Sequence, residues 1–272
     1  MKPYLKAAIF LILLTVLDFL LRKGFVAFMI PIFLSQHLTI LLLFVLFAAL
    51  SWYITKWFCQ RDQCTLRDLG ISLDWKNRID FLYGLIVGVG LWAIVSLLQS
   101  IFAGFSWEWR SDFSPWSIFY GLIFIFIADL GTELYTRGYP LTRFKDSLGT
   151  KSAILIMVLF VGLKSYSPGI QGELLLYTML IPALHTVFFS IIYFLTGRLG
   201  AALGLHTGAN FITISIFDMR VGHPGQAIPS GMFQPGKSVE SLSLTALQLP
   251  WVFMAVALSF MVYFLWRKKA TG

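Results

Sequence analysis

The sequence predicts an all-α, polytopic integral membrane protein, a helical bundle with about eight transmembrane helices. Two observations carry this prediction. First, 58% of the 272 residues are hydrophobic and only 12% are charged, with a mean hydropathy of +0.79, whereas soluble domains carry about 25% charged residues. Second, long apolar runs recur along the chain, each close to the ~20 residues that one helical crossing needs. This composition excludes a disordered chain and an ordinary cytosolic enzyme.

The apolar runs are expected to form a single membrane domain, residues 1–272. Helices are favoured over barrel strands because the runs are continuously apolar rather than alternating. The first run follows Lys2 and Lys6 and is predicted to be a retained signal anchor. The short stretch from Phe25 to Leu34 is predicted to be re-entrant or part of a bent second helix. The expected spans are about 5–21, 36–56, 81–104, 117–136, 152–163, 174–196, 200–218 and 248–266.

The distribution of Lys and Arg predicts an inner- or plasma-membrane protein with both termini in the cytoplasm. On this topology fifteen Lys and Arg residues lie on the cytoplasmic side and six lie outside, the bias that the positive-inside rule requires. The same rule explains the net charge of +8 without a nucleic-acid partner, and none is expected. Arg22 and Lys23 oppose the assignment: a hairpin of the first apolar segments would place the N-terminus on the other side.

Two connecting segments and two cysteines complete the prediction. Residues 57–80 mix both signs of charge and are expected to fold as a cytoplasmic connector. Residues 219–247 are rich in Gly, Pro and Ser and are expected to form a long outer loop that caps the bundle or contacts a partner. Cys59 and Cys64 are predicted to be free thiols, since a reducing compartment disfavours disulfides and two further zinc ligands are not nearby.

Charged residues inside a span are costly, so they are candidates for function or for buried pairs. Asp129, Glu133 and Arg137 are spaced i, i+4 and i+8 in the fourth span and therefore share one face of a helix. Glu133 and Arg137 can pair within that helix. Two roles stay open for Glu133: an ion pair that orients the helix, or a carboxylate held in a polar cavity.

His206 and Asn210 lie four residues apart in the seventh span, so their side chains point the same way. Gly204 and Gly208 leave room for close packing against another helix. An imidazole and an amide that converge in a bundle can donate hydrogen bonds to a peptide carbonyl or its oxyanion. The alternative is that the two polar groups bond across helices and hold the bundle together.

Three further polar residues lie in or at the ends of spans. Lys164, at the end of the fifth span, is typical of a side chain that reaches back to the membrane surface. His185 follows Pro182 in mid-span and is expected to bond a neighbouring carbonyl rather than act in catalysis. Asp18, in the first span, is expected to be paired.

In their order along the chain, these clusters resemble the motifs of the CAAX protease and bacteriocin-processing family, which includes type II CAAX prenyl endopeptidases. The family pattern is Glu-Glu-x-x-x-Arg, then Phe-x-x-x-His, then His-x-x-x-Asn, on successive helices of an eight-span bundle. Here the three motifs fall on Thr132-Glu133-Leu-Tyr-Thr-Arg137, on Phe160 to Lys164 and on His206 to Asn210. The resemblance covers about residues 80–215.

Two departures from the family pattern concern the activation of water. The resemblance implies that the first Glu of motif one and the His of motif two activate the attacking water, while His206 and Asn210 stabilise the oxyanion. This chain has Thr132 and Lys164 at the two activating positions. Threonine cannot accept a proton near neutral pH, and lysine acts as a base only if its pKa is strongly depressed. A substitute base built from Asp129 with Lys164 is the remaining option.

Three functions are therefore compared. The first is a catalytically degenerate relative that binds or regulates a membrane protein, a membrane-anchored peptide or a lipid-linked partner. The second is an active, metal-independent endopeptidase with a rearranged base that cuts a lipidated or membrane-anchored peptide. The third is an unrelated transporter or channel, which an internal repeat would support, and we see none. Membrane lipids are expected partners, while no cofactor and no metal are expected because the four histidines are dispersed.

Overall fold

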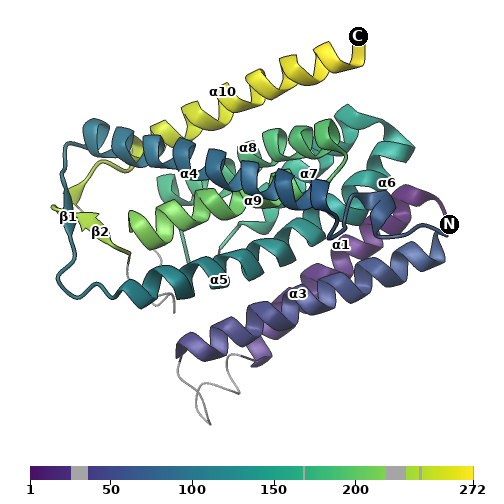
Figure 1. Ribbon diagram of the computed structural model, residues 1–272, viewed down its shortest axis with the longest axis horizontal. Helices are drawn as coiled ribbons and strands as arrows, with labels where there is room; N and C mark the ends of the chain where they lie inside the picture. The colour runs from purple at the N-terminus through teal and green to yellow at the C-terminus, as the bar shows by residue number, and fades with distance from the viewer. Residues whose placement is uncertain (26–35, 168, 219–230, 239–240, 272) are drawn as a thin grey trace.

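The computed structural model describes residues 1–25, 36–167, 169–218, 231–238 and 241–271, and these form a bundle of α-helices (Figure 1). The predicted all-α, polytopic bundle is confirmed. The helices are α1 (Pro3–Leu20), α3 (Gln36–Arg61), α4 (Trp75–Ala103), α5 (Pro115–Glu133), α6 (Tyr139–Leu148), α7 (Thr150–Lys164), α8 (Gly172–Thr196), α9 (Leu199–Asn210) and α10 (Leu244–Thr271).

Seven helical segments of the described chain are long and apolar enough to cross a membrane, and they coincide with seven of the eight expected spans. The fifth expected span, 152–163, corresponds to α7. This helix has only 15 residues and is therefore about 22 Å long, shorter than the ~30 Å hydrocarbon core. The apolar stretch that follows Phe25 lies outside the described residues.

Each of the two helices that carry the polar motifs runs directly into a π-helical turn. The turn Leu134–Gly138 follows α5 and leads into α6, and the turn Phe211–Ile216 follows α9. A π-helical turn adds a residue to one turn of the helix and often lies at a functional site. Here both turns come immediately after motif residues, so the side chains before and after each turn change direction relative to a straight helix.

The connector between α3 and α4 is folded, as expected, around the carboxylate of Asp62. Lys6 of α1 forms an ion pair with Asp62 Oδ1, Tyr139 Oη donates a hydrogen bond to Oδ2 at 2.7 Å, and Arg143 Nε lies 3.1 Å from Oδ2. The predicted free thiols are confirmed, and the one at Cys64 accepts a hydrogen bond from Arg143. Residues from α1, α6 and the connector therefore meet at this end of the bundle.

This cluster makes the stability of the protein depend on pH. Burial raises the pKa of Asp62, but the hydrogen bonds from Lys6 and Tyr139 and the charge of Arg143 outweigh it and hold the pKa below the usual range. A carboxyl whose pKa is depressed on folding stabilises the fold above its unfolded pKa of about 3.9, and the contribution is lost as the pH falls through the folded value.

We therefore expect Asp62→Asn to be less stable than the wild type near neutral pH and the difference to shrink below about pH 4. Thermal melting of both proteins in detergent across this range checks the expectation. A difference in melting temperature that stays constant down to the acid limit would contradict it.

A two-stranded ribbon lies at the opposite end of the bundle from the connector (Figure 1). Strand β1 (Trp107–Trp109), between α4 and α5, pairs antiparallel with β2 (Phe233–Pro235), which belongs to the described part of the expected 219–247 loop. These strands were not predicted from the sequence, because three residues are too few for an alternating pattern. The loop therefore folds over this end of the bundle where it is described.

Candidate functional site

The two polar motifs on α5 and α9 face each other inside the bundle. His206 Nδ1 lies 2.8 Å from Glu133 Oε1, and Asn210 Nδ2 donates a hydrogen bond to Asp129 Oδ1 at 2.8 Å. His206 Nε2 is 3.6 Å from the same Asp129 oxygen. The i, i+4 spacing on each helix thus produces two parallel contacts between the helices, and the four side chains form one cluster.

The expected ion pair between Glu133 and Arg137 is present and almost fully buried. Arg137 Nη1 bonds Glu133 Oε1, and the two side chains are 4% and 0% exposed. The guanidinium also bonds the hydroxyl of Thr136 and lies 4.7 Å from the ring centroid of Phe189. Glu133 therefore has two partners at one oxygen, Arg137 on its own helix and His206 on α9.

A polar cavity of about 440 Å³ opens beside this cluster. Asp129, Thr132, Arg137, His206 and Asn210 contribute to its lining, whereas Glu133 does not and lies behind it. The remaining lining residues come from the π-helical turn after α5, from α7 and the residue after it, and from α8 and α10. They are Thr136, Val161, Lys164, Ser165, Ile181, Pro182, His185, Thr186, Phe189 and Trp251.

The two altered motif positions both line the cavity, but their polar groups have other partners. Thr132 donates its hydroxyl to the carbonyl of Ala128 at 3.0 Å. Lys164 Nζ lies 3.4 Å from Asp18 Oδ2 and 4.1 Å from the ring centroid of Tyr135. The contacts of Lys164 in the described chain thus join α7 to α1 rather than to Asp129.

Asp18 is paired, as expected, and it has two cationic neighbours. Besides Lys164, Arg22 Nε lies 2.9 Å from Asp18 Oδ1, in the π-helical turn Leu21–Phe25 that follows α1. The carboxylate is 12% exposed. Asp18 therefore links the first span to the second motif through Lys164. This link was not predicted, because the two residues are far apart in the chain.

His185 does not bond a carbonyl within the described chain. Its Nε2 atom is buried without a hydrogen-bond partner there, and the ring packs against aromatic side chains, with Trp92 at 5.5 Å and Trp251 at 5.8 Å between centroids. The nearby Pro182 lies one turn earlier in α8, and its carbonyl accepts the hydroxyl of Thr186 at 2.8 Å. Thr136 also lines the cavity and was not predicted, although its i+4 spacing from Thr132 places it on the cavity face.

In this cluster the carboxylate of Asp129 contacts His206 and Asn210, the two hydrogen-bond donors that the family resemblance assigns to stabilising an oxyanion. Asp129 Oδ1 accepts the amide of Asn210 and faces His206 Nε2. Donors stabilise an oxyanion only if they are free to point at it in the transition state. Among the described residues, no group of three or more His, Cys, Asp or Glu side chains has the arrangement of a metal site.

Comparison with known proteins agrees with this architecture. Searches of curated proteins and of solved structures gave no match. The sequence model of the family described as type II CAAX prenyl endopeptidase Rce1-like matches residues 114–212. This region runs from the start of α5 to the π-helical turn after α9 and contains all three motif positions. The chain is therefore an integral membrane protein whose residues 114–212 are similar to the Rce1-like, type II CAAX prenyl endopeptidase family.

Proposed function

We propose that this protein is a non-proteolytic relative of the CAAX prenyl endopeptidases and that its polar cavity binds a membrane-anchored peptide or protein. The observation that carries the proposal is the position of Asp129. Its carboxylate accepts a hydrogen bond from the side-chain amide of Asn210 and faces His206. A substrate carbonyl would therefore have to compete with the Asp129 carboxylate for these two donors. Hydrolysis also needs a general base that activates water, and such a base contributes about 10²–10⁴-fold to the reaction rate. In this chain the two motif positions for that role hold Thr132 and Lys164.

The cavity supports a binding role for two reasons. It lies among helices that are long and apolar enough to span a membrane, where a membrane-anchored ligand can approach it. Its lining combines an acceptor, Asp129, with cationic donors, Arg137 and Lys164. These groups can hydrogen-bond the carbonyl and amide groups of a peptide, which have no water to bond at this depth.

Photo-crosslinking from inside the cavity tests the proposal. A photoreactive amino acid at Val161, which lines the cavity, is expected to capture a membrane protein or peptide in native membranes. The matched control is Leu159 on the same helix, which is 57% exposed and does not line the cavity. The capture is expected to weaken when Asp129→Ala is added, because the acceptor in the cavity is lost.

The same membranes are assayed for cleavage of a lipidated, membrane-anchored peptide. We expect no turnover above the level of the His206→Ala variant. Cleavage that disappears in His206→Ala, or capture that is equal at Val161 and Leu159, would contradict the proposal.

One observation favours a second candidate, an endopeptidase with a rearranged base. His185 Nε2 is buried at the cavity without a partner in the described chain, and an imidazole is the usual general base. In that case His185→Ala would abolish peptide cleavage while the protein stays folded, whereas Lys164→Ala, which breaks the contact with Asp18, would not. Loss of cleavage only in Lys164→Ala and Asp129→Asn would instead identify the base expected from the sequence.

A further inference from the structure

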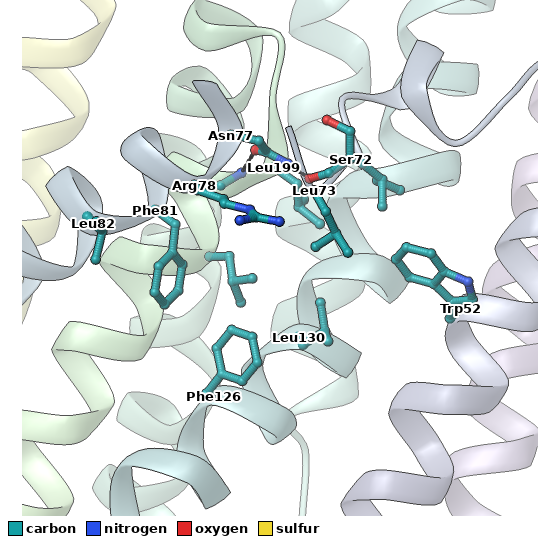
Figure 2. Close-up of a pocket in the computed structure, with 13 residues that line it drawn as sticks. Trp52, Ser72, Leu73, Asn77, Arg78, Phe81, Leu82, Phe126, Leu130 and Leu199 are labelled. Atoms are coloured by element: carbon teal, nitrogen blue, oxygen red, sulfur yellow. Dashed lines mark hydrogen bonds between the residues drawn. The ribbon is translucent and has the colours of Figure 1, made fainter. Parts of the chain in front are cut away.

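A second hollow, separate from the polar cavity, lies between α3, α4, α5 and α9 (Figure 2). It has a volume of about 350 Å³, within the range of small-molecule sites. Its walls are mostly apolar side chains from all four helices, including Trp52 of α3, Phe81 and Leu82 of α4, Phe126 of α5 and Leu203 of α9. We refer to it as the α4 groove.

Arg78 is the cationic group in the lining of the α4 groove. Figure 2 shows its guanidinium reaching over the hollow, beside Phe81 and Leu73. Within the described chain no hydrogen bond or ion pair engages this guanidinium, whereas the neighbouring Arg198 is paired with Asp80. The α4 groove thus offers an apolar channel with one unneutralised cation at its mouth.

Asn77 and Ser72, two other polar side chains at the α4 groove, are already bonded within the protein. Asn77 donates to the carbonyl of Gly70 and accepts the backbone N–H of Gly200 at 2.7 Å. Ser72 donates its hydroxyl to Asp74 at 2.7 Å. Recognition of a polar ligand here therefore depends on Arg78.

The position of Arg78 along α4 places it at the depth of lipid headgroups. The helix has 29 residues and is about 43 Å long, so its ends extend beyond the ~30 Å hydrocarbon core into the headgroup layers. Arg78 lies in the first turn. Trp75, 72% exposed at the first position of the helix, is typical of the membrane–water interface.

We propose that the α4 groove binds an anionic phospholipid, with one acyl chain against its apolar wall and the phosphate on Arg78. Charge complementarity selects this occupant. A peptide helix would fill the apolar part but would leave the guanidinium unpaired, and a zwitterionic lipid would offer a phosphate already balanced by its own cation. Basic pockets between transmembrane helices are known to hold anionic headgroups in this way.

The site is independent of the proposed function of the polar cavity, but the two share a wall. The helices α5 and α9 separate them: Leu130 and Leu203 face the α4 groove, while Asp129 and Asn210 face the cavity. A lipid held in the α4 groove would therefore brace the pair of helices that hold the polar cluster together. Binding of the lipid would raise the melting temperature of the protein.

Native mass spectrometry of the full-length protein in mild detergent tests the proposal. Phosphatidylglycerol and phosphatidylcholine with identical chains are added separately. We expect the wild type to retain one phosphatidylglycerol with about fivefold preference, the effect of one basic residue near an anionic lipid. Arg78→Gln is expected to abolish the preference, while Lys76→Gln, which removes the same charge from an exposed position outside the α4 groove, keeps it.

A second pair of variants tests the apolar wall. Leu82→Trp fills the α4 groove and is expected to lower lipid retention, whereas Ile86→Trp, one turn along the same helix and outside the groove, is not. Phosphatidylglycerol is expected to raise the melting temperature of the wild type and of Lys76→Gln but not of Arg78→Gln.

Three results would overturn the proposal. The first is equal retention of the two lipids by the wild type. The second is the same loss of preference in Arg78→Gln and Lys76→Gln, which would indicate only a diffuse surface attraction. The third is a bound peptide or a second copy of the chain that disappears in Leu82→Trp, which would assign the α4 groove to a protein partner.

Discussion

Replacing Arg137 by methionine is expected to lower the free energy of unfolding by about 3–5 kcal/mol, the typical cost of leaving one member of a buried ion pair alone. Arg137 is 4% exposed and Glu133 is fully buried. Methionine keeps much of the volume and the contact with Phe189, so the loss measures the charge rather than a cavity. Denaturant unfolding in detergent micelles, followed by circular dichroism, measures the change.

A double-mutant cycle separates the pair from its surroundings. Glu133→Gln is also expected to destabilise the protein, because it leaves the guanidinium of Arg137 without its carboxylate. The double variant Glu133→Gln/Arg137→Met is expected to lose much less than the sum of the two single variants, since no uncompensated buried charge remains.

The matched control is the exposed pair of Arg110 and Asp112, whose nitrogen and oxygen are 3.2 Å apart while Asp112 is 68% exposed. Asp112→Asn is expected to cost at most about 1 kcal/mol, as surface pairs do. If Arg137→Met also cost so little, or if the two single effects simply added, the pair would be solvated and would not order the α5 motif.

The pair of Glu133 and Arg137 also shows how much of the site could be predicted from the sequence. The i, i+4 rule placed Glu133 beside Arg137, and His206 on the same face as Asn210, and the structure agrees at both places. Helical periodicity cannot tell which faces of different helices meet. The contact between Glu133 and His206 and the one between Asp129 and Asn210 emerged only from the packing of α5 against α9.

Long-range partners and irregular backbone were beyond prediction for physical reasons. Lys164 finds Asp18 across most of the chain, and neither local spacing nor hydropathy carries that information. The π-helical turns after Glu133 and Asn210 have no propensity signature of their own. Hydropathy, in contrast, predicted a short fifth span, 152–163, and this range lies within the 15-residue helix α7.

Close helix packing, in contrast, was visible in the sequence as glycines four residues apart, a pattern that allows backbones to approach. The expectation rested on Gly204 and Gly208 of α9. The structure adds the complementary glycines Gly84 and Gly88 of α4. A Cβ atom built at Gly84 would lie 2.4 Å from the carbonyl oxygen of Ala201, so the two backbones are in direct contact.

Replacing Gly204 by alanine is accordingly expected to be among the most destabilising single methyl additions in the protein. The new Cβ would lie 2.0 Å from the carbonyl oxygen of Phe81, and backbone cannot move aside as a side chain can. Overpacking costs about 1–3 kcal/mol and occasionally more, and we expect the upper end of this range. Thermal melting and denaturant unfolding measure the loss.

The control is Gly90→Ala on α4, where no atom lies within 4 Å of the added methyl group. Alanine is favoured over glycine in a helix by about 0.5–1 kcal/mol, so this variant is expected to be at least as stable as the wild type. The same chemical change would thus have opposite effects on stability at two positions of one helix pair.

The Gly204→Ala change would also affect the site, because moving α9 away from α4 shifts His206 relative to Glu133. Photo-crosslinking from Val161 is therefore expected to decrease in this variant. Equal stabilities of the two variants would mean that α4 and α9 are further apart in the membrane, and that the polar cluster does not depend on their contact.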